Sequence, residues 1–451
     1  MEDQPKHIAV VIGAGPAGLY GARHLANAGV QVILLNRDIK PGGLAEYGIY
    51  YNKYKMKQGL RRQFQQIIDH PNITYFGNVT ISSEGCLSLD DIRGLNFDAI
   101  LVTVGAQGTK WLGLPGEHLK GVYHAKDLVY YYNNLPPFST KEINIGKRIA
   151  LVGAGNVMMD IAHWLIRDRK VDEVTAIVRR GPAEVKFDKK EMEITAANLD
   201  LDALDTEMQR VAPMMEAVGQ DPIAAKEYIL AGLPKALEPV SNTRFRFYFL
   251  ASPITILGDD HERACTLIVE HNILVLKGGE TKARGAGIRR HLDVDTVIFA
   301  IGDKVDDVFG LPVQWNEFVK NPSPVYPIDG QSYEAYDPDA GKPIPGVFVA
   351  GWSREASSGL VGVARKDGEN GAKAILEYLN GVEPKQKLEK SADTLEFLLE
   401  NSCSPVVTRD DLKILEAYEE AEARRLRVVD YKLKTNDEML AVMGLEQQTQ
   451  S

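Results

Sequence analysis

The hydrophobic pattern at the start of the chain predicts a strand, a turn, a helix and a second strand. Residues 8–12 form an unbroken apolar run, as expected of a buried parallel strand. A helical stretch follows, Gly29 is placed to end it, and residues 30–36 form the next strand. The pattern therefore indicates a βαβ unit at the N-terminus.

The same pattern returns about 140 residues later. Residues 148–152 form a strand, a helical stretch follows, and "EVTAIVRRG" (173–181) is the next strand. The run "DTVIFAIG" (295–302) predicts a further buried strand. Two βαβ units in one chain of 451 residues predict an α/β protein with two Rossmann-like domains.

The first βαβ unit carries the GxGxxG spacing of a dinucleotide-binding turn. Gly13 allows the tight turn, Gly15 lets the backbone approach a pyrophosphate, and Gly18 lets the helix pack against the strand. The start of the helix supplies free N–H groups and the positive end of a dipole for the phosphates. This context predicts dinucleotide binding rather than a purely structural turn.

The residue that ends the second strand departs from this pattern. An acid is expected there to bind a ribose hydroxyl, but the position holds Asn36, followed by Arg37 and Asp38. An Asn side chain can still bond a hydroxyl, although without charge assistance. Either the ribose is held more weakly or Asp38 contacts it.

The second unit has Gly153 and Gly155 at the turn, with Met158 in the third position. Its second strand ends in Arg179 and Arg180, where an acid would select NADH. Two guanidinium groups suit a 2′-phosphate, so the sequence predicts NADPH at this turn and FAD at the first. A flavin and a nicotinamide in one protein indicate hydride transfer between them.

Composition and charge narrow the partners. The chain has 52 basic and 62 acidic residues, a net charge of −10, which argues against nucleic acid as the main partner. No apolar run reaches the ~20 residues of a membrane span, and the first strand begins too early to leave room for a signal or transit peptide. We therefore expect a cytoplasmic protein that binds no membrane.

The three cysteines, Cys86, Cys265 and Cys403, are far apart in the sequence. Their spacing predicts neither a zinc cluster nor a CxxC redox pair, and no metal site is expected. A reducing compartment is compatible with this pattern.

Five separated motifs resemble one family of flavoproteins. They are "GAQGTKWLGLPGEHLKGVYHAKDLVYYYNNLP" (105–136), "RRGPAEVKFDKKEME" (179–193), "FRFYFLASPITILG" (245–258), "PIPGVFVAGWSREASSGLVGVARKDGENGAKAILEYL" (343–379) and the late "VVTRDDLKILEAYEEAEARR" (406–425). Together they resemble the adrenodoxin-reductase-like ferredoxin–NADP reductases over essentially the whole chain. The resemblance implies a discontinuous FAD domain, residues 1–106 and 303–451, with an NADP domain, 107–302, inserted between its two parts.

The resemblance also implies roles for single residues. Trp352 would cover the flavin or the nicotinamide, Glu191 would lie near the nicotinamide, and a helix starting near Val363 would aim its positive end at the flavin. Lys53, Glu191 and Trp352 are the candidate catalytic residues. The candidate cofactor-binding residues are Gly13, Gly15, Pro16, Ala17, Gly18, Asn36, Arg37, Gly43, Leu44, Gly105, Gly153, Gly155, Asn156, Val157, Asp160, Arg179, Arg180, Glu191, Gly351, Trp352, Gly359, Leu360, Val361 and Gly362.

One position departs from the family. After "GGLAEYG" the family has a histidine in a polar network beside the flavin, and this chain has Lys53 there. A lysine only donates hydrogen bonds and keeps its charge unless it is buried, so a proton relay through histidine does not carry over. The electron acceptor or the flavin potential can differ accordingly.

The expected partner is a ferredoxin- or flavodoxin-type electron carrier, and a net charge of −10 would repel an acidic one unless basic residues cluster locally. Three sequence clusters are candidates for docking it, and their residues are Lys53, Lys55, Lys57, Arg61 and Arg62; Arg244 and Arg246; and Arg289 and Arg290. The oligomeric state is not predicted.

The sequence has three alternatives to a ferredoxin–NADP reductase. The cysteine spacing speaks against a disulfide reductase. A flavoprotein reductase or monooxygenase acting on a small organic substrate stays open because of Lys53, as does an electron-input subunit of a larger redox complex. The charged C-terminal part, from about residue 384, predicts helices without chemistry, including one capped by Asn436 or Asp437, and a disordered end, "EQQTQS".

Overall fold

A computed structural model describes residues 7–356, 359–384, 388–403 and 405–445. The chain forms two compact units. The first consists of residues up to 109, 130–140 and 302 onward, and the second of 110–129 and 141–301. The sequence prediction had placed the segment 130–140 with the inserted domain, and the contacts place it with the first unit.

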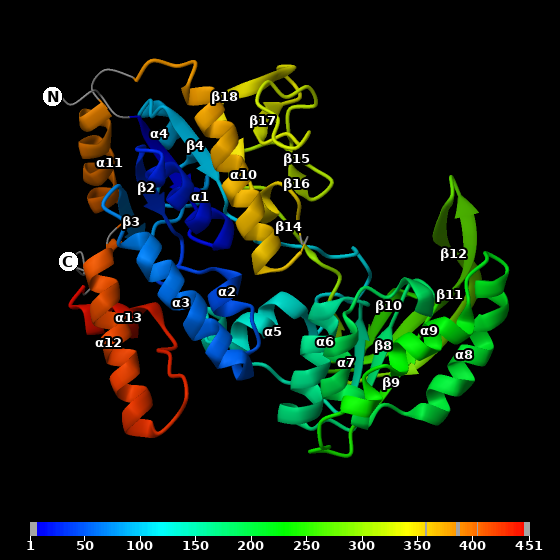
Figure 1. The fold of residues 1–451 in the computed structure, drawn as a ribbon. Helices are drawn as coiled ribbons and strands as arrows, with labels where there is room; N and C mark the ends of the chain where they lie inside the picture. Colours follow the sequence, from blue (N-terminus) through cyan, green and yellow to red (C-terminus); the bar gives the residue numbers. More distant parts are fainter. Residues whose placement is uncertain (1–6, 357–358, 385–387, 404, 446–451) are drawn as a thin grey trace. The chain divides into compact units, whose positions relative to one another are not determined.

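The first unit is built on a seven-stranded sheet in the order β17-β18-β4-β1-β2-β3-β19 (Figure 1). Its inner strands are parallel, and the two outer strands pair antiparallel. The bounds are β1 Ile8–Ile12, β2 Gln31–Leu35, β3 Ile73–Gly77, β4 Ala99–Val102, β17 Glu334–Asp337, β18 Lys342–Val349 and β19 Val407–Thr408. The predicted strand 8–12 is confirmed, and its neighbours on both sides make it central in the sheet.

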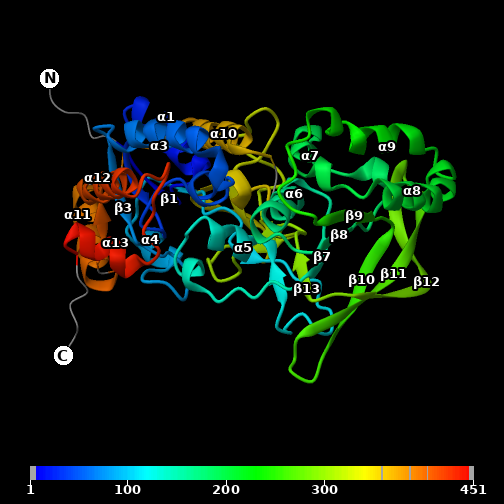
Figure 2. The same ribbon diagram turned by 90° about the horizontal axis from the view of Figure 1, so that it is seen from below.

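Two hydrophobic clusters cover the two faces of this sheet, because alternate strand residues point to opposite sides. Val11 and Leu34 face the helices α1, α3, α10, α12 and α13, whereas Val10 and Leu35 face α4, α11 and the hairpin β15–β16 (Figure 2). The helices of this unit are α1 Pro16–Asn27, α2 Leu44–Tyr47, α3 Tyr54–Ile68, α4 Leu89–Gly94, α10 Val361–Leu379, α11 Leu388–Ser402, α12 Arg409–Leu426 and α13 Asn436–Met443. The hairpin consists of β15 Val313–Gln314 and β16 Glu317–Phe318. A separate pair of short strands is formed by β5 Gly108–Thr109 and β14 Asp303–Lys304.

A disulfide joins Cys86 to Cys403, with 5.0 Å between the two Cα atoms. The sequence analysis did not predict this bond, because 317 residues of chain separate the two side chains that the fold brings together. Cys403 lies in the same cluster as Leu395 and Leu399, so the bond fastens the end of α11 to this side of the sheet. Cysteine spacing alone consequently does not exclude disulfide chemistry.

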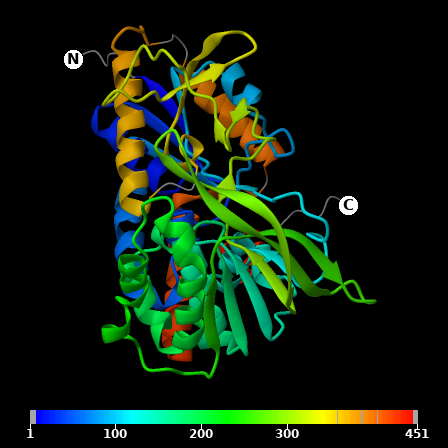
Figure 3. The ribbon, with the colours of Figure 1, turned by 90° about the vertical axis from the view of Figure 1, so that its right-hand side faces the viewer.

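The second unit has a five-stranded parallel sheet in the order β6-β13-β7-β8-β9. Its elements are β6 Val122–His124, β7 Arg148–Val152, β8 Glu173–Ile177, β9 Arg244–Tyr248, β13 Thr296–Phe299, α6 Asn156–His163, α7 Lys189–Thr195, α8 Leu201–Glu216 and α9 Pro222–Leu230, while α5 Ala125–Tyr132 runs across the boundary between the units. A three-stranded antiparallel sheet, β10 Ala251–Gly258, β11 Ala264–Lys277 and β12 Glu280–Asp293, completes the unit (Figure 3).

Two parallel sheets, each containing a strand–glycine turn–helix unit, confirm the predicted α/β fold with two Rossmann-like halves. In the described ranges, no helix combines the length and the apolar character needed to cross a membrane. The helix predicted near 436 is α13, but its cap is Thr435, whose hydroxyl accepts from the Glu438 N–H in a capping box. The predicted disorder of residues 446–451 falls outside the described residues.

Candidate functional site

The first glycine turn leads from β1 into the start of α1. A Cβ on Gly18 would stand 1.8 Å from the Gly13 carbonyl oxygen, so helix and strand pack this closely only with glycine. Gly15 has nothing within 4 Å of the place of a Cβ, which leaves open space before the helix N-terminus, where Pro16 and Ala17 begin α1. The turn thus fits a pyrophosphate that accepts from the free N–H groups.

Two further turns of the first unit converge on this helix start. A Cβ on Gly43, at φ +49°, would lie 3.2 Å from the Gly15 Cα, which places Gly43 and the following Leu44 beside the turn. A Cβ on Gly351, at φ +68°, would lie 2.7 Å from the Ala17 Cβ. Gly351 follows Gly43 by more than 300 positions in the sequence, and the structure brings both glycines beside the start of α1.

The turn that carries Gly351 and Trp352 is held by polar contacts. The Gly351 N–H donates to Asp367 Oδ2 at 2.6 Å, and the Gly105 N–H donates to the Ser353 hydroxyl at 2.9 Å. Trp352 itself is half-buried in this 3₁₀ turn. Gly105 and Trp352 are therefore neighbours in the fold, as two parts of one candidate site would require.

The helix that follows, α10, begins at Val361, two residues before the predicted start near Val363. Gly359 and Leu360 precede it, and Gly362 has nothing within 4 Å of the place of a Cβ. Leu360, directly before the helix, is 68% exposed. The free N–H groups of the first turn of α10 are the positive end of its dipole.

Asn36 has a different role from the predicted one. Its Oδ1 accepts the Ala14 N–H at 3.0 Å, and its Nδ2 donates to the carbonyls of Asp38 at 2.7 Å and Lys40 at 3.1 Å. The side chain is 6% exposed, so the amide already uses its donors and one acceptor within the protein. Asn36 therefore fixes the glycine turn, and the structure does not favour it as the ribose ligand.

Arg37 is exposed, and its guanidinium donates to Asp38 Oδ1 at 3.0 Å and to Gln107 Oε1 at 3.2 Å. The charge of Asp38 is the main cause that raises the pKa of Arg37 above its ordinary value. Thr103, which the sequence reasoning missed, donates from Oγ1 to the carbonyls of Ile12 and Gly13 at 3.0 and 2.8 Å. No local signal in the sequence marks it, because its partners lie about ninety residues away.

The second glycine turn lies in the other unit and repeats the geometry. A Cβ on Gly153 would lie 2.4 Å from the Ala300 carbonyl oxygen, and Gly155 has open space before α6. Val157, in the first turn of α6, is 44% exposed, and Asp160 one turn later is half-buried. The space in front of Gly155 fits a second pyrophosphate.

Asn156 fastens the next loop to this turn. Its Nδ2 donates to Asp188 Oδ2 at 2.9 Å, its Oδ1 accepts the Asp188 N–H at 2.8 Å, and the Lys186 N–H donates to the Ala154 carbonyl. Asp188 precedes α7, whose first turn contains Glu191. These contacts bring Glu191, half-buried, to the same end of the sheet as the glycine turn.

Arg179 and Arg180 follow β8 at the carboxyl edge of the parallel sheet. Asn272 Nδ2 donates to the Arg179 carbonyl at 2.9 Å and fixes its backbone. Arg180 pairs with Glu184 at 3.6 Å, whereas Arg179 is exposed and has no carboxylate in ion-pair distance among the described residues. Arg179 is therefore the guanidinium better placed to receive a phosphate.

The predicted docking cluster at residues 53–62 is only partly on the surface. Lys57 is 1% exposed, and Arg61 binds Glu46 and Asp430, so both side chains are internal structural groups. Lys55 and Arg62 are exposed, and Lys53 is half-buried. Lys57 and Arg61 therefore contribute little to a docking surface in this cluster, because Lys57 is buried and Arg61 pairs with carboxylates that the sequence around it does not show.

The other two clusters differ from each other. Arg244 and Arg246 both bind Glu173, and Arg246 also binds Asp200, so their charges are neutralised. Arg289 and Arg290 are exposed on β12 and, as neighbours in a strand, point to opposite faces.

The chain has similarities to known proteins in sequence and in fold. Residues 7–215 match the model described as pyridine nucleotide-disulphide oxidoreductase. The chain is 28% identical to NADPH-ferredoxin reductase FprA of Mycobacterium tuberculosis (strain ATCC 25618 / H37Rv), with 93% of this chain and 94% of the relative covered. It is 27% identical to the mitochondrial NADPH:adrenodoxin oxidoreductase of Arabidopsis thaliana, with 79% of each covered.

In fold the chain is similar to the solved structure of Mycobacterium tuberculosis FprA in complex with NADPH. The TM-score is 0.79 at 24% identity, with 98% of this chain and 99% of that chain covered. The resemblance predicted from the motifs agrees with these comparisons: the chain is similar in sequence to an NADPH-ferredoxin reductase over 93% of its length and to an NADPH:adrenodoxin oxidoreductase over 79%.

Proposed function

We propose that this protein is an FAD-dependent oxidoreductase that passes electrons between NADPH and a ferredoxin-type one-electron carrier. The observation that carries the proposal is the pair of open glycine turns, one in each unit, with the exposed Arg179 following the strand beside the second. The relatives named for NADPH and for ferredoxin or adrenodoxin support it. In this proposal the first unit is the FAD domain and the second is the NADP domain.

FAD, when bound, supplies the chemistry that accepts a hydride and gives up electrons one at a time. The first glycine turn and the start of α1 hold its pyrophosphate, with Gly43 and Gly351 allowing close approach from two sides. The positive end of the α10 dipole would stabilise negative charge on a bound flavin, and the half-buried Trp352 would limit the access of water to it.

NADPH is held by the second turn. The N–H groups at the start of α6 bind the pyrophosphate, and Arg179 with Arg180 binds the 2′-phosphate that distinguishes NADPH from NADH. Glu191 is proposed beside the nicotinamide, in reach of its carboxamide. Asn156 is proposed as the residue that positions α7 and Glu191 through its two bonds to Asp188.

Lys53 is proposed near the flavin in place of a histidine. It donates rather than accepts, and hydride transfer between nicotinamide and flavin requires no proton from a side chain. The carrier would be a ferredoxin or a flavodoxin. The remaining candidates from the sequence clusters for docking it are the exposed cations Lys55, Arg62, Arg289 and Arg290.

An anaerobic titration tests the proposal. A flavin absorbance band that bleaches with low NADPH, and only with much more NADH, is the expected result. NADPH-dependent reduction of cytochrome c that requires added ferredoxin would then support the carrier. A protein that cannot be loaded with FAD, or that reduces an organic substrate but no carrier, would refute the proposal.

A further inference from the structure

A cavity of about 160 Å³ lies in the first unit at the carboxyl ends of two neighbouring strands. Arg37 and Asp38, directly after β2, and Asn78 and Thr80, directly after β3, form one side of it. In a Rossmann unit the ribose of a dinucleotide lies at the end of the second strand. The cavity therefore adjoins the place where the adenosine half of a bound dinucleotide is expected.

The opposite side of the cavity comes from elsewhere in the chain. Pro137 and Asn436 both line it, and Asn436 is the first residue of α13, almost 400 positions beyond Asp38. The sequence of this C-terminal part predicts helices without chemistry. The position of Asn436 at the cavity depends on the contacts that hold residues 430–436.

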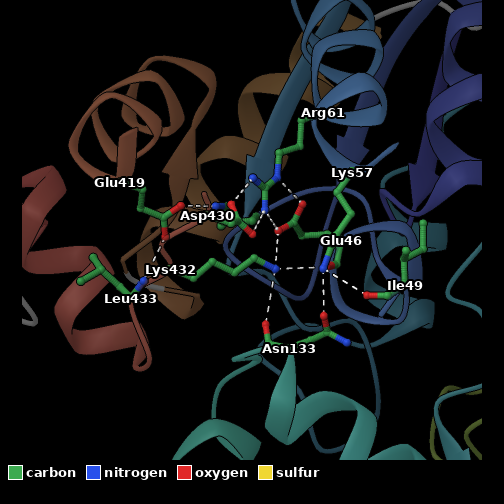
Figure 4. A network of polar contacts seen from close by, with 10 residues as sticks. Glu46, Ile49, Lys57, Arg61, Asn133, Glu419, Asp430, Lys432 and Leu433 are labelled. Carbon is green, nitrogen blue, oxygen red and sulfur yellow. Dashed lines mark hydrogen bonds and ion pairs between the residues drawn. The ribbon is translucent and has the colours of Figure 1, made fainter. Parts of the chain in front are cut away.

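Buried ion pairs hold this segment (Figure 4). Lys432 Nζ lies 2.6 Å from Glu46 Oε1 and donates to the Glu46 carbonyl at 3.1 Å. Arg61 binds Glu46 at 2.6 Å with one nitrogen and Asp430 at 2.7 Å with another. Since Lys432 and Glu46 are 7% and 2% exposed, each needs the other's charge to be stable where it is.

The next residues of the segment are fixed one by one. The Leu433 N–H donates to Glu419 Oε1 at 3.1 Å, and Glu419 also pairs with Lys40. The Lys434 carbonyl accepts from the Ser139 hydroxyl. Thr435 then caps α13, so the backbone that carries Asn436 is positioned by contacts at every preceding residue from 432 onward.

The same network reaches the dinucleotide turn. Glu46 lies in α2, which begins directly after Gly43, and Gly43 stands against the Cα of Gly15. The carboxylate that binds Lys432 is thus three residues from Gly43, which lies beside the turn expected to hold the pyrophosphate. The burial of Glu46 would raise the pKa of its carboxyl, but Lys432 and Arg61 keep it well below the ordinary value, so the pair stays ionised.

We propose that Asn436 forms part of the outer wall of the site for the adenosine half of FAD and contacts the adenosine, and that Lys432 is the positioning residue of the segment that carries it. This inference rests on the proposed function, since it names a further contact for the same cofactor. The Asn436 amide offers a donor and an acceptor, which suits the edge of an adenine or the ribose hydroxyls. The strand-end residue Asn36 is committed to the protein, so a contact from this wall supplies what that position lacks.

The test is the dissociation constant of FAD from the flavin-free full-length protein, measured by fluorescence titration. Asn436→Ala is expected to weaken FAD binding about threefold to tenfold, the loss of one hydrogen bond. Asn436→Trp, which fills the cavity, is expected to weaken it more. The matched control is Asn401→Ala, an exposed helical asparagine whose amide bonds only the Phe397 carbonyl and that does not line the cavity.

A second pair of variants tests the positioning role. Lys432→Met is expected to weaken FAD binding by tenfold or more, Lys432→Arg to restore part of it, and Lys413→Met, an exposed lysine of α12, to leave it unchanged. The thermal midpoint of each flavin-free variant and its NADPH dissociation constant are measured alongside. Asn436→Ala should change neither of these.

The outcomes separate the two proposals. If the unaltered protein binds no FAD, the proposed function fails. If it binds FAD and both Asn436 variants bind FAD as tightly as it does, the wall is not part of the site and this inference is overturned. Weaker FAD binding that only follows a lower thermal midpoint would overturn it as well.

Discussion

Replacing Lys57 by Met is expected to remove a pH dependence from the stability of the first unit. Lys57 Nζ donates to the Ile49 carbonyl at 3.2 Å and to Asn133 Oδ1 at 2.8 Å, and the side chain is 1% exposed. Burial, and next the charge of Lys432, lower the pKa of Lys57 to about 6. Arg61 lowers it further, while Glu46 and Asp430 oppose the shift.

The direction of the effect follows from the two protonation states. Between about pH 6 and 10.5 the unfolded chain keeps the Lys57 proton and the folded chain has lost it, so the unfolded state binds more protons and stability rises with pH. The slope is at most about 1.4 kcal/mol per pH unit, and the full interval corresponds to roughly 6 kcal/mol. Below about pH 6 Lys57 is protonated in the folded and in the unfolded state, and the full cost of burying its charge lowers the free energy of unfolding.

The Met variant lacks this titration but leaves two buried acceptors without their donor, at about 1–3 kcal/mol each and independent of pH. The difference in free energy of unfolding between the unaltered protein and Lys57→Met should therefore grow in favour of lysine by about 1 kcal/mol per unit from pH 7 to 9. Urea unfolding followed by circular dichroism measures it. Lys55→Met, exposed on the same helix, is the control, and equal slopes for the two variants would refute the reasoning.

Three further results are expected. Arg179→Ala should raise the dissociation constant of NADPH about tenfold to a hundredfold, by the loss of a charge-assisted bond, and leave that of NADH unchanged in parallel titrations. Cys403→Ser should lower the stability of the first unit by about 2–4 kcal/mol, and a reductant should then have no further effect on its unfolding midpoint, although it lowers that of the unaltered protein. Thr435→Ala should cost about 1 kcal/mol in urea unfolding, because the cap of α13 is lost; no change would mean that the capping box contributes nothing.

The central strands could be predicted from the sequence because their signal is local. The runs at 8–12 and 148–152 are strands β1 and β7 with the predicted bounds, since a strand buried on both faces needs apolar residues at every position. The glycine turns could also be predicted from the sequence, because their conformations depend on residues within one turn. The sequence also contains the signal for the cap of α13, since Thr435 and Glu438 have the spacing of a capping box. The prediction of Asn436 or Asp437 as the cap did not use this signal.

The buried charges could not be predicted in this way. Arg61 looked like a surface cation because the stretch around it contains no acid, yet its partner Asp430 is 369 residues away. The disulfide was missed for the same reason. Pairings of this kind depend on tertiary structure alone, and a single sequence contains no periodic signal for them.

Asn36 departs from the dinucleotide motif, and its hydrogen bonds in the structure give this departure a structural role. Its amide accepts from the Ala14 N–H and donates to the carbonyls of Asp38 and Lys40. Asn36→Asp would restore the acid of the dinucleotide motif, but it would place a carboxylate oxygen against those two carbonyls in a site that is 6% exposed.

We therefore expect Asn36→Asp to weaken FAD binding and to lower stability by about 2–4 kcal/mol, the cost of two lost bonds and a buried charge. A titration with FAD and an unfolding curve measure both effects, with Asp38→Asn as the control for a change of charge at the same strand end. Tighter FAD binding by Asn36→Asp would mean that the carboxylate turns outward to the ribose, and the glycine turn would then not depend on this side chain.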